Sequence, residues 1–278
     1  MGFERNGWEL LRGIFNHEAE EVSVVVPAIT ATFCKKYLKE IDHDALTFDQ
    51  QIVSLGQANP KLLFELNGRI SNLPVIKRIA SSEKAVEIFS NFSGVDPKFV
   101  YAQGNANFLI NTPSQKRLQY SWHTAFQGYP KRSCFINFWL PLMRGKTPEN
   151  GTLKIANCSH KFLFPAIEGK HIARDGAKSA LTQFRVPDQF VDRFEIESVV
   201  ADPGDVAIMH PLLLHSSSDN RSDKPSYVFI FKIWSDISDF SLSSKLDNRM
   251  YDESNDELII PTVIDTSHSM TKDAVRLY

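Results

Sequence analysis

The succession of short β-rich runs from Phe99 onward is the feature that most constrains the fold of this chain. The runs are rich in β-branched and aromatic residues, and clusters of Pro, Gly, Asn and Ser separate them: KFVYAQGNANFLIN, SCFINFWLPL, SVVADPGDVAIMH and SYVFIFKIW. Many short strands with turn signals between them are typical of a β-sandwich or a β-barrel. The sequence therefore predicts a mainly β core over this part of the chain.

The chain before this region has the period of helices instead. The segments PAITATFCKKYLKEI and PVIKRIASSEKAVEIFSNFSG place apolar residues at three- and four-residue spacing, and the second ends at a Gly. At 278 residues with 42% hydrophobic content, the chain can bury one full core as a single domain. We expect flanking helices over residues 1–95, a β core over 96–240 and a tail over 241–278 that the pattern does not assign.

A long insertion interrupts the strand series at residues 163–195, which are polar and mixed in character. Within it, a helix is possible around Gly176–Phe184. Insertions of this length form either lids over binding sites or plain surface excursions, and the sequence favours neither.

Charge and cysteine content exclude several classes of partner. The 31 Lys and Arg against 33 Asp and Glu give a formal net charge of −2, with no basic run, so nucleic acid is not an expected partner. Cys34, Cys134 and Cys158 are far apart and form no CxxC pair, which argues against a disulfide framework and a thiolate zinc site. No segment approaches the roughly 18 apolar residues of a membrane span. We expect a soluble cytoplasmic protein that acts on a small molecule.

Three ordered stretches carry the chemical signal. They are QYSWHTA at 119–125, just before the strand run 133–142, then NGTLKIANCSHK at 150–161 and PGDVAIMHPLLLHSSSDNRS at 203–222. This order resembles the phytanoyl-CoA dioxygenase family, whose members show a WHxD or WHxE segment, a WxPL strand, an nGxLxxxxgSHK segment and a GDxxxxhxxxxHxSxxNxS segment. The resemblance covers roughly residues 100–234. It implies a double-stranded β-helix, or jelly roll, that uses iron(II) and 2-oxoglutarate.

The resemblance makes His123 and His215 the two imidazole ligands of the iron. Neutral imidazole suits iron(II), and a facial arrangement leaves positions open for the cosubstrate and oxygen. A single His in a hydrophobic strand is more often a hydrogen-bonded core residue, and that reading competes. His160 lies in the SHK turn, and His210 is separated from His215 by an odd offset that would place it on the other face of a strand. We expect neither of these two to be a ligand.

The first departure from the family pattern is Ala125, which stands where the family has its carboxylate ligand. No Asp or Glu occurs between Lys116 and Arg132, so the usual triad of two His and one carboxylate cannot form locally. The nonheme iron halogenases, which resemble this superfamily, have Ala or Gly at the same place, where chloride binds the iron. Ala125 is therefore a candidate chloride site.

The second departure is Ser226, eleven positions after His215, where the family commonly has an Arg for the far carboxylate of 2-oxoglutarate. Ser226, Val228, Ile230 and Lys232 share one strand face by two-residue alternation, so Lys232 could supply the cation instead. Its competing interpretation is a strand residue whose ammonium reaches solvent. Lys224 is a poorer candidate, because Pro225 places it in the turn.

Trp139 and Ser217 are further cosubstrate candidates by resemblance, from the WxPL strand and the HxS segment. A core aromatic and a turn hydroxyl are their structural alternatives. The segment from Asn220 to Ser222 resembles the family's NxS turn and looks structural. Asn137 and Gln103 could point into the barrel, but the sequence does not fix which strand face is inside.

Three functions from different classes remain open. The first is an iron(II)/2-oxoglutarate halogenase with chloride in place of the carboxylate. The second is an ordinary hydroxylase of the same family, with water or a substrate group completing the iron shell, or with its natural carboxylate removed by engineering. The third is a non-catalytic jelly-roll binding protein that has lost both the carboxylate and the Arg. Retention of the Trp122-His123 pair and of the segment ending at His215 favours a metal site.

Overall fold

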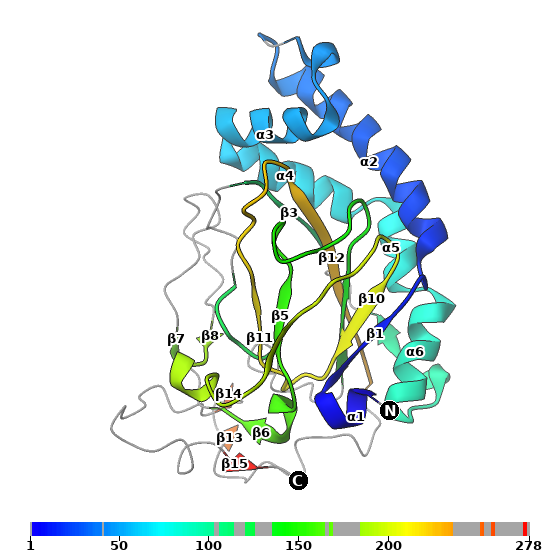
Figure 1. Cartoon of the computed structure of the whole chain (residues 1–278). Coiled ribbons are helices and arrows are strands. Elements are labelled where there is room, and N and C mark those ends of the chain that lie inside the picture. Colours follow the sequence, from blue (N-terminus) through cyan, green and yellow to red (C-terminus); the bar gives the residue numbers. More distant parts are fainter. Residues whose placement is uncertain are drawn as a thin grey trace.

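The computed structural model divides the chain into a helical part and a β core, as Figure 1 shows. The structure describes residues 2–40, 42–102, 106–113, 120–125, 135–164, 167–168, 184–235, 251–252, 257–258 and 275–276. The N-terminal helices are α1 (Gly2–Asn6), α2 (Asn16–Tyr37), α3 (Phe48–Ala58), α4 (Pro60–Ser71), α5 (Pro74–Ala80) and α6 (Glu83–Ser93). These helices all lie before residue 95, with one strand among them.

Local capping signals explain where these helices begin and end. Thr47 and Gln50 form a reciprocal capping box at the start of α3, and the Asn59 side chain accepts from the backbone of Lys61 at the start of α4. The apolar pattern that predicts one helix over residues 74–93 is divided into α5 and α6. The cause is Ser82, whose hydroxyl caps α6 by accepting from the backbone N–H of Ala85. Gly94, at φ 73°, ends α6.

Two sheets form the β core. The larger has the order β1-β10-β4-β12-β2, with β3 also paired to β12, and the smaller has the order β11-β5-β9. Their strands are β1 (Trp8–Leu11), β2 (Tyr101–Ala102), β3 (Asn107–Asn111), β4 (Phe135–Leu140), β5 (Leu153–Ala156), β9 (Ile196–Ser198), β10 (Val206–Met209), β11 (His215–Ser217) and β12 (Ser226–Trp234). All of their pairings are antiparallel. This is the predicted mainly β jelly roll with flanking helices.

Short pairings complete the described elements. They join β6 (Phe162–Leu163) to β15 (Val275–Arg276), β7 (Ile167–Glu168) to β8 (Phe184–Arg185), and β13 (Tyr251–Asp252) to β14 (Glu257–Leu258). Phe184 thus begins a strand where the sequence pattern allowed the end of a helix, and the rest of that possible helix lies outside the described residues. So does Gln103. No helix in the described part of the chain is both long and apolar enough to cross a membrane.

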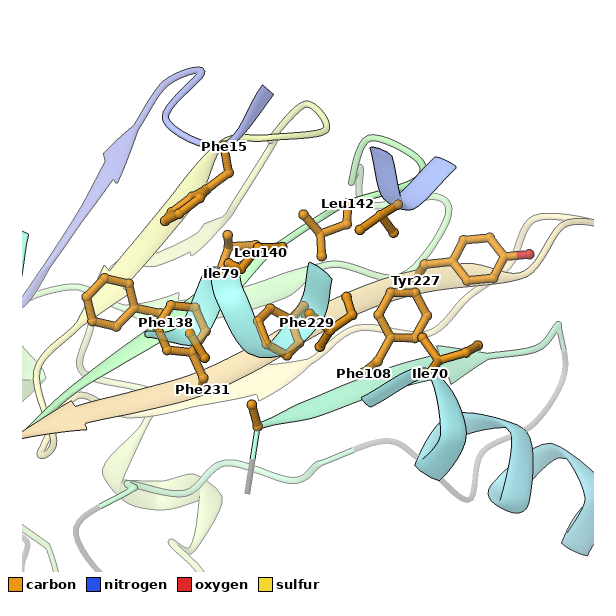
Figure 2. Packing of buried hydrophobic residues seen from close by; sticks show 14 of the residues in the cluster. Phe15, Ile70, Ile79, Phe108, Phe138, Leu140, Leu142, Tyr227, Phe229 and Phe231 are labelled. Atoms are coloured by element: carbon orange, nitrogen blue, oxygen red, sulfur yellow. The ribbon is translucent and has the colours of Figure 1, made fainter. Parts of the chain in front are cut away.

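Alternation along β12 separates two apolar layers. Tyr227, Phe229 and Phe231 point toward the helices and are almost fully buried in one cluster with helix side chains such as Ile70 and Ile79 (Figure 2). The intervening residues Val228 and Ile230 pack instead in a second cluster, which joins the two sheets through Trp8, Trp139, Leu153, Ile155, Val199, Ala201, Ala207, Met209 and Leu213. The inner face of the jelly roll is therefore the face of β12 that carries Ser226, Val228, Ile230 and Lys232.

Strand β1, which the sequence pattern did not predict, forms the edge of the larger sheet, and the Gly-Asp pair of the third motif holds the turn that follows it. The buried carboxylate of Asp205 accepts from the backbone N–H of Gly13 at 2.8 Å and from the Arg12 guanidinium at 2.6 Å. Gly204 has φ 91°, and a Cβ there would lie 2.3 Å from Asn16 Oδ1. This motif segment therefore has a structural role, which is to fix the turn between the end of β1 and the start of α2 against the core.

Candidate metal and cosubstrate site

His123 and His215 lie side by side at one point of the smaller sheet. They form an isolated antiparallel bridge in which each backbone N–H donates to the other residue's carbonyl at 3.1 Å. The pairing continues from Ser217 N to Tyr120 O at 3.0 Å, so residues 120–123 are laid along β11. The two imidazole centroids are 4.2 Å apart. The structure thus brings together the two residues that the motifs predicted as ligands.

Each imidazole is held by a backbone carbonyl at the same ring position. His123 Nδ1 is 2.8 Å from Ser121 O, and His215 Nδ1 is 2.8 Å from Leu213 O. A carbonyl oxygen only accepts, so both Nδ1 atoms carry the proton and both Nε2 atoms keep a lone pair. Carbonyl contacts of this kind are typical of metal-binding His, since they fix both the tautomer and the ring orientation.

Burial keeps both rings neutral. Desolvation lowers the pKa of His123 to about 4, and it lowers the pKa of His215 well below its usual 6.5, with smaller contributions from the neighbouring imidazole and from the positive charge of Lys232. Neutral imidazole is the form that binds a metal ion. The donor set therefore fits iron(II), for which the two Nε2 atoms would supply two coordination positions.

The third ligand position of the family is occupied by Ala125, which is partly buried and lies two residues beyond His123. Within the described ranges, no group of three or more His, Cys, Asp and Glu side chains is placed to hold a metal ion. The candidate centre is therefore a pair of imidazoles, with Ala125 two residues beyond the first of them.

His160 and His210 form a separate pair. Their ring centroids are 5.3 Å apart, the His210 ring is 6.2 Å from the ring of Phe3, and His160 Nε2 is 3.1 Å from Glu4 O. His210 is not on the opposite face of a strand shared with His215, so the prediction from strand alternation is wrong. Strand β10 ends at Met209, and the chain then turns into the other sheet, so His210 and His215 do not share a strand.

The inner face around the imidazoles carries the other predicted residues. Trp139 is opposite Ile230 on β12 and packs in the inner cluster, while Ser217 is opposite Leu153 on the smaller sheet. Asn137, two residues before Trp139 on β4, is buried, and its Nδ2 has no hydrogen-bond partner among the residues that the structure describes. An amide donor without a partner on this face suits a ligand with oxygen atoms.

Two lysines lie at opposite ends of this face, of which Lys146 is buried and Lys232 is partly buried. Lys232 is opposite Asn137, and burial lowers its pKa to about 8. Because its charge lowers the pKa of both imidazoles, it lies near the metal end. Ser226 is six residues away on the same strand, about 20 Å at the usual rise, and its hydroxyl accepts from the ammonium of Lys146.

Lys146 is a buried lysine on this face that the sequence did not predict. It follows β4 in a loop, where a Lys is ordinarily solvated, and its side chain is nevertheless turned inward and buried. The only local signal is that Lys146 lies four residues before Asn150, the residue with which the second motif begins. Its contact with Ser226 is between segments far apart in the chain, which no local pattern reveals.

Comparison with known proteins identifies the family and the fold. The phytanoyl-CoA dioxygenase (PhyH) family model matches residues 76–226, and no curated protein matches the chain. Among solved structures, EctD from S. alaskensis with 2-oxoglutarate and 5-hydroxyectoine is 17% identical, with a TM-score of 0.53, over 84% of this chain and 74% of that one. EvdO2 from Micromonospora carbonacea var. aurantiaca is 14% identical, with a TM-score of 0.54, over 84% of this chain and 88% of that one.

A third similar structure is the epimerase SnoN in complex with Fe³⁺, alpha ketoglutarate and nogalamycin RO. It is 14% identical, with a TM-score of 0.51, over 84% of this chain and 81% of that one. At these identities the structures establish the fold, whereas the family model covers more than half of the sequence, including both imidazoles and Ser226. The chain therefore belongs to the phytanoyl-CoA dioxygenase family of iron(II)/2-oxoglutarate-dependent oxygenases.

Proposed function

We propose that this protein is an iron(II)/2-oxoglutarate-dependent halogenase in which chloride occupies the position that Ala125 leaves open. The observation that carries the proposal is the combination of two neutral imidazoles, each with a free Nε2 lone pair, and a methyl side chain two residues beyond the first. A carboxylate at position 125 would fill the coordination position and bring its own negative charge. A methyl group does neither, so a small anion can take the place.

Different residues of the chain would bind the metal and orient its ligands. His123 and His215 would hold the metal, and the carbonyls of Ser121 and Leu213 keep the imidazoles in the ligating tautomer. Bound iron(II) with 2-oxoglutarate supplies oxidative attack on a substrate C–H bond. The apolar inner cluster includes Ile155, which is opposite His215, and apolar surroundings strengthen the attraction between a metal ion and an anion.

Hydroxylation is the second candidate. It is favoured by the structure of EctD with 2-oxoglutarate and 5-hydroxyectoine, since a protein of the same fold holds a hydroxylated compound together with 2-oxoglutarate. In this case water or a substrate group would complete the iron shell beside Ala125. A purely binding role has less support, because both imidazoles are held in the tautomer that a metal requires.

Anaerobic reconstitution tests the proposal without knowledge of the substrate. The protein is titrated with iron(II) and 2-oxoglutarate, and the visible charge-transfer band of the chelate is recorded with and without chloride. We expect the band to shift with chloride in the natural protein and in Ala125→Gly, which keeps the space. In Ala125→Asp the band should persist and no longer respond. A band that ignores chloride in the natural protein would favour the hydroxylase instead.

A further inference from the structure

Lys146 is a buried cation on the inner side of the jelly roll. Only 3% of its surface is exposed, and its ammonium donates to the hydroxyl of Ser226 and lies 3.4 Å from the carbonyl of Gly151. Its backbone forms a bridge with Ala201, a member of the inner cluster. The side chain is thus held between the loop after β4 and the first residue of β12.

No acidic side chain balances this charge in the part of the chain that the structure describes. Both contacts of the ammonium are to neutral oxygens, and the nearest charge that affects it is the positive guanidinium of Arg144. Arg144 itself is paired with Asp49 at 2.6 Å and also donates to the carbonyl of Pro225. Burial of an unbalanced ammonium is costly, and its pKa is accordingly lowered to about 7. Such a residue is retained at a cost in stability, which an anionic ligand would offset.

The backbone interval between the imidazoles and the contact of Lys146 suits a short dicarboxylate. Ile155 is opposite His215 on the smaller sheet, and Gly151, whose carbonyl contacts the ammonium, is four residues back along the same segment. That interval is about 13 Å at the usual strand rise. A short dicarboxylate that chelates a metal at His123 and His215 would extend along this interval, with its far carboxylate reaching the ammonium.

We propose that Lys146, together with the hydroxyl of Ser226, binds the far carboxylate of 2-oxoglutarate. The cation for this group then comes from the loop after β4, and residue 226 contributes a hydrogen bond in place of a charge. This inference rests on the use of 2-oxoglutarate in the proposed function, and it does not depend on chloride.

Lys232, the cation that the sequence favoured, competes for the same role. It shares the inner face with Ser226 but is six residues further along β12, beside Asn137 and near both imidazoles. A ligand group cannot contact both ammonium groups, because about 20 Å of strand separates their positions. The contact with Ser226 places Lys146 at the end that is remote from the metal, which is where a far carboxylate belongs.

The test compares two 2-oxo acids by calorimetry on the iron(II)-loaded protein under anaerobic conditions. 2-Oxoglutarate has the far carboxylate, and 2-oxobutyrate has the same chelating end without it. We expect Lys146→Met to weaken 2-oxoglutarate binding by roughly 10- to 100-fold, the worth of a charged hydrogen bond, and to leave 2-oxobutyrate binding unchanged. Lys232→Met should keep the preference for 2-oxoglutarate. A second control is Lys154→Met, which alters a Lys whose ammonium lies over the ring of Trp122, and this variant should also keep the preference.

A rescue variant guards against a mere folding defect. In Lys146→Met/Ser226→Arg the cation is moved to residue 226, and we expect the preference for 2-oxoglutarate to return. The inference is overturned if Lys146→Met keeps the preference, or if Lys232→Met abolishes it. A natural protein that binds neither acid would overturn the inference together with the cosubstrate. A natural protein that binds 2-oxoglutarate but ignores chloride would remove the halogenase alone.

Discussion

His123 and His215 exchange both of their backbone hydrogen bonds, each 3.1 Å long, although one lies before β4 and the other begins β11. The bridge fixes the two side chains on the same side of the smaller sheet, with ring centroids 4.2 Å apart. The relative position of the imidazoles is therefore set by the backbone rather than by a metal ion. This pre-organisation is what a metal centre with few protein ligands needs.

Removal of either imidazole should abolish tight iron binding. We expect His123→Ala and His215→Ala each to lower iron(II) affinity by at least about 100-fold, because two protein ligands are too few to lose one. His160→Gln should bind iron normally, since that ring contacts Glu4 and the ring of His210. Iron retained after gel filtration, measured by mass spectrometry, checks this. Retention of one iron per chain by both Ala variants would refute the assignment.

The carboxylate of Asp205 should be a main support of the N-terminal strand. Asp205→Ala removes the acceptor of the Gly13 and Asp202 backbone N–H groups and of the Arg12 guanidinium, and we expect a loss of about 2–4 kcal/mol in the free energy of unfolding. The matched control is Asp202→Ala, whose side chain is exposed and should cost under about 0.5 kcal/mol. Urea denaturation measures both. Equal effects would contradict the structural role of the motif.

The metal-free protein should lose stability in acid. Burial lowers the pKa of His160 to about 4 and that of His210 to about 3, from about 6.5 in the unfolded chain. Between these values the unfolded state binds more protons, so the free energy of unfolding falls as the pH falls, by up to about 1.4 kcal/mol per pH unit for each ring. His160→Gln should reduce the slope. A flat profile from pH 6.5 to 4 in denaturant melts would contradict the burial of these rings.

The charge of Lys146 should make the apo protein more stable at alkaline pH. Its pKa is about 7 in the folded chain and about 10.5 when unfolded, so within this window the unfolded state binds more protons and stability rises with pH. Lys146→Met should be more stable at pH 7 by a few kcal/mol and should lose most of this rise. Lys232, with a pKa of about 8, accounts for the remainder. Thermal unfolding from pH 7 to 10 measures both, and identical profiles would exclude a buried charged Lys146.

The sequence by itself determined the fold class, the helical N-terminal part and the two imidazoles. Local periodicity and turn chemistry specify each element, and the ordered motifs specify the family. It also predicted the vacant carboxylate position at Ala125, because that position is defined by its spacing from His123. The inner face of β12 followed from two-residue alternation, which needs no tertiary information.

Only the tertiary structure decided which partners the charged side chains contact across the core. Arg12, which follows β1, is paired with Asp205, and the ammonium of Lys146 donates to Ser226. Both contacts join segments that are far apart in the chain. His210 was assigned to the wrong strand because the turn after Met209 carries the chain from one sheet to the other. Periodicity gives the face that a residue occupies on its own strand. It does not give the partner on the opposite sheet, because that partner depends on how the two sheets are stacked and aligned.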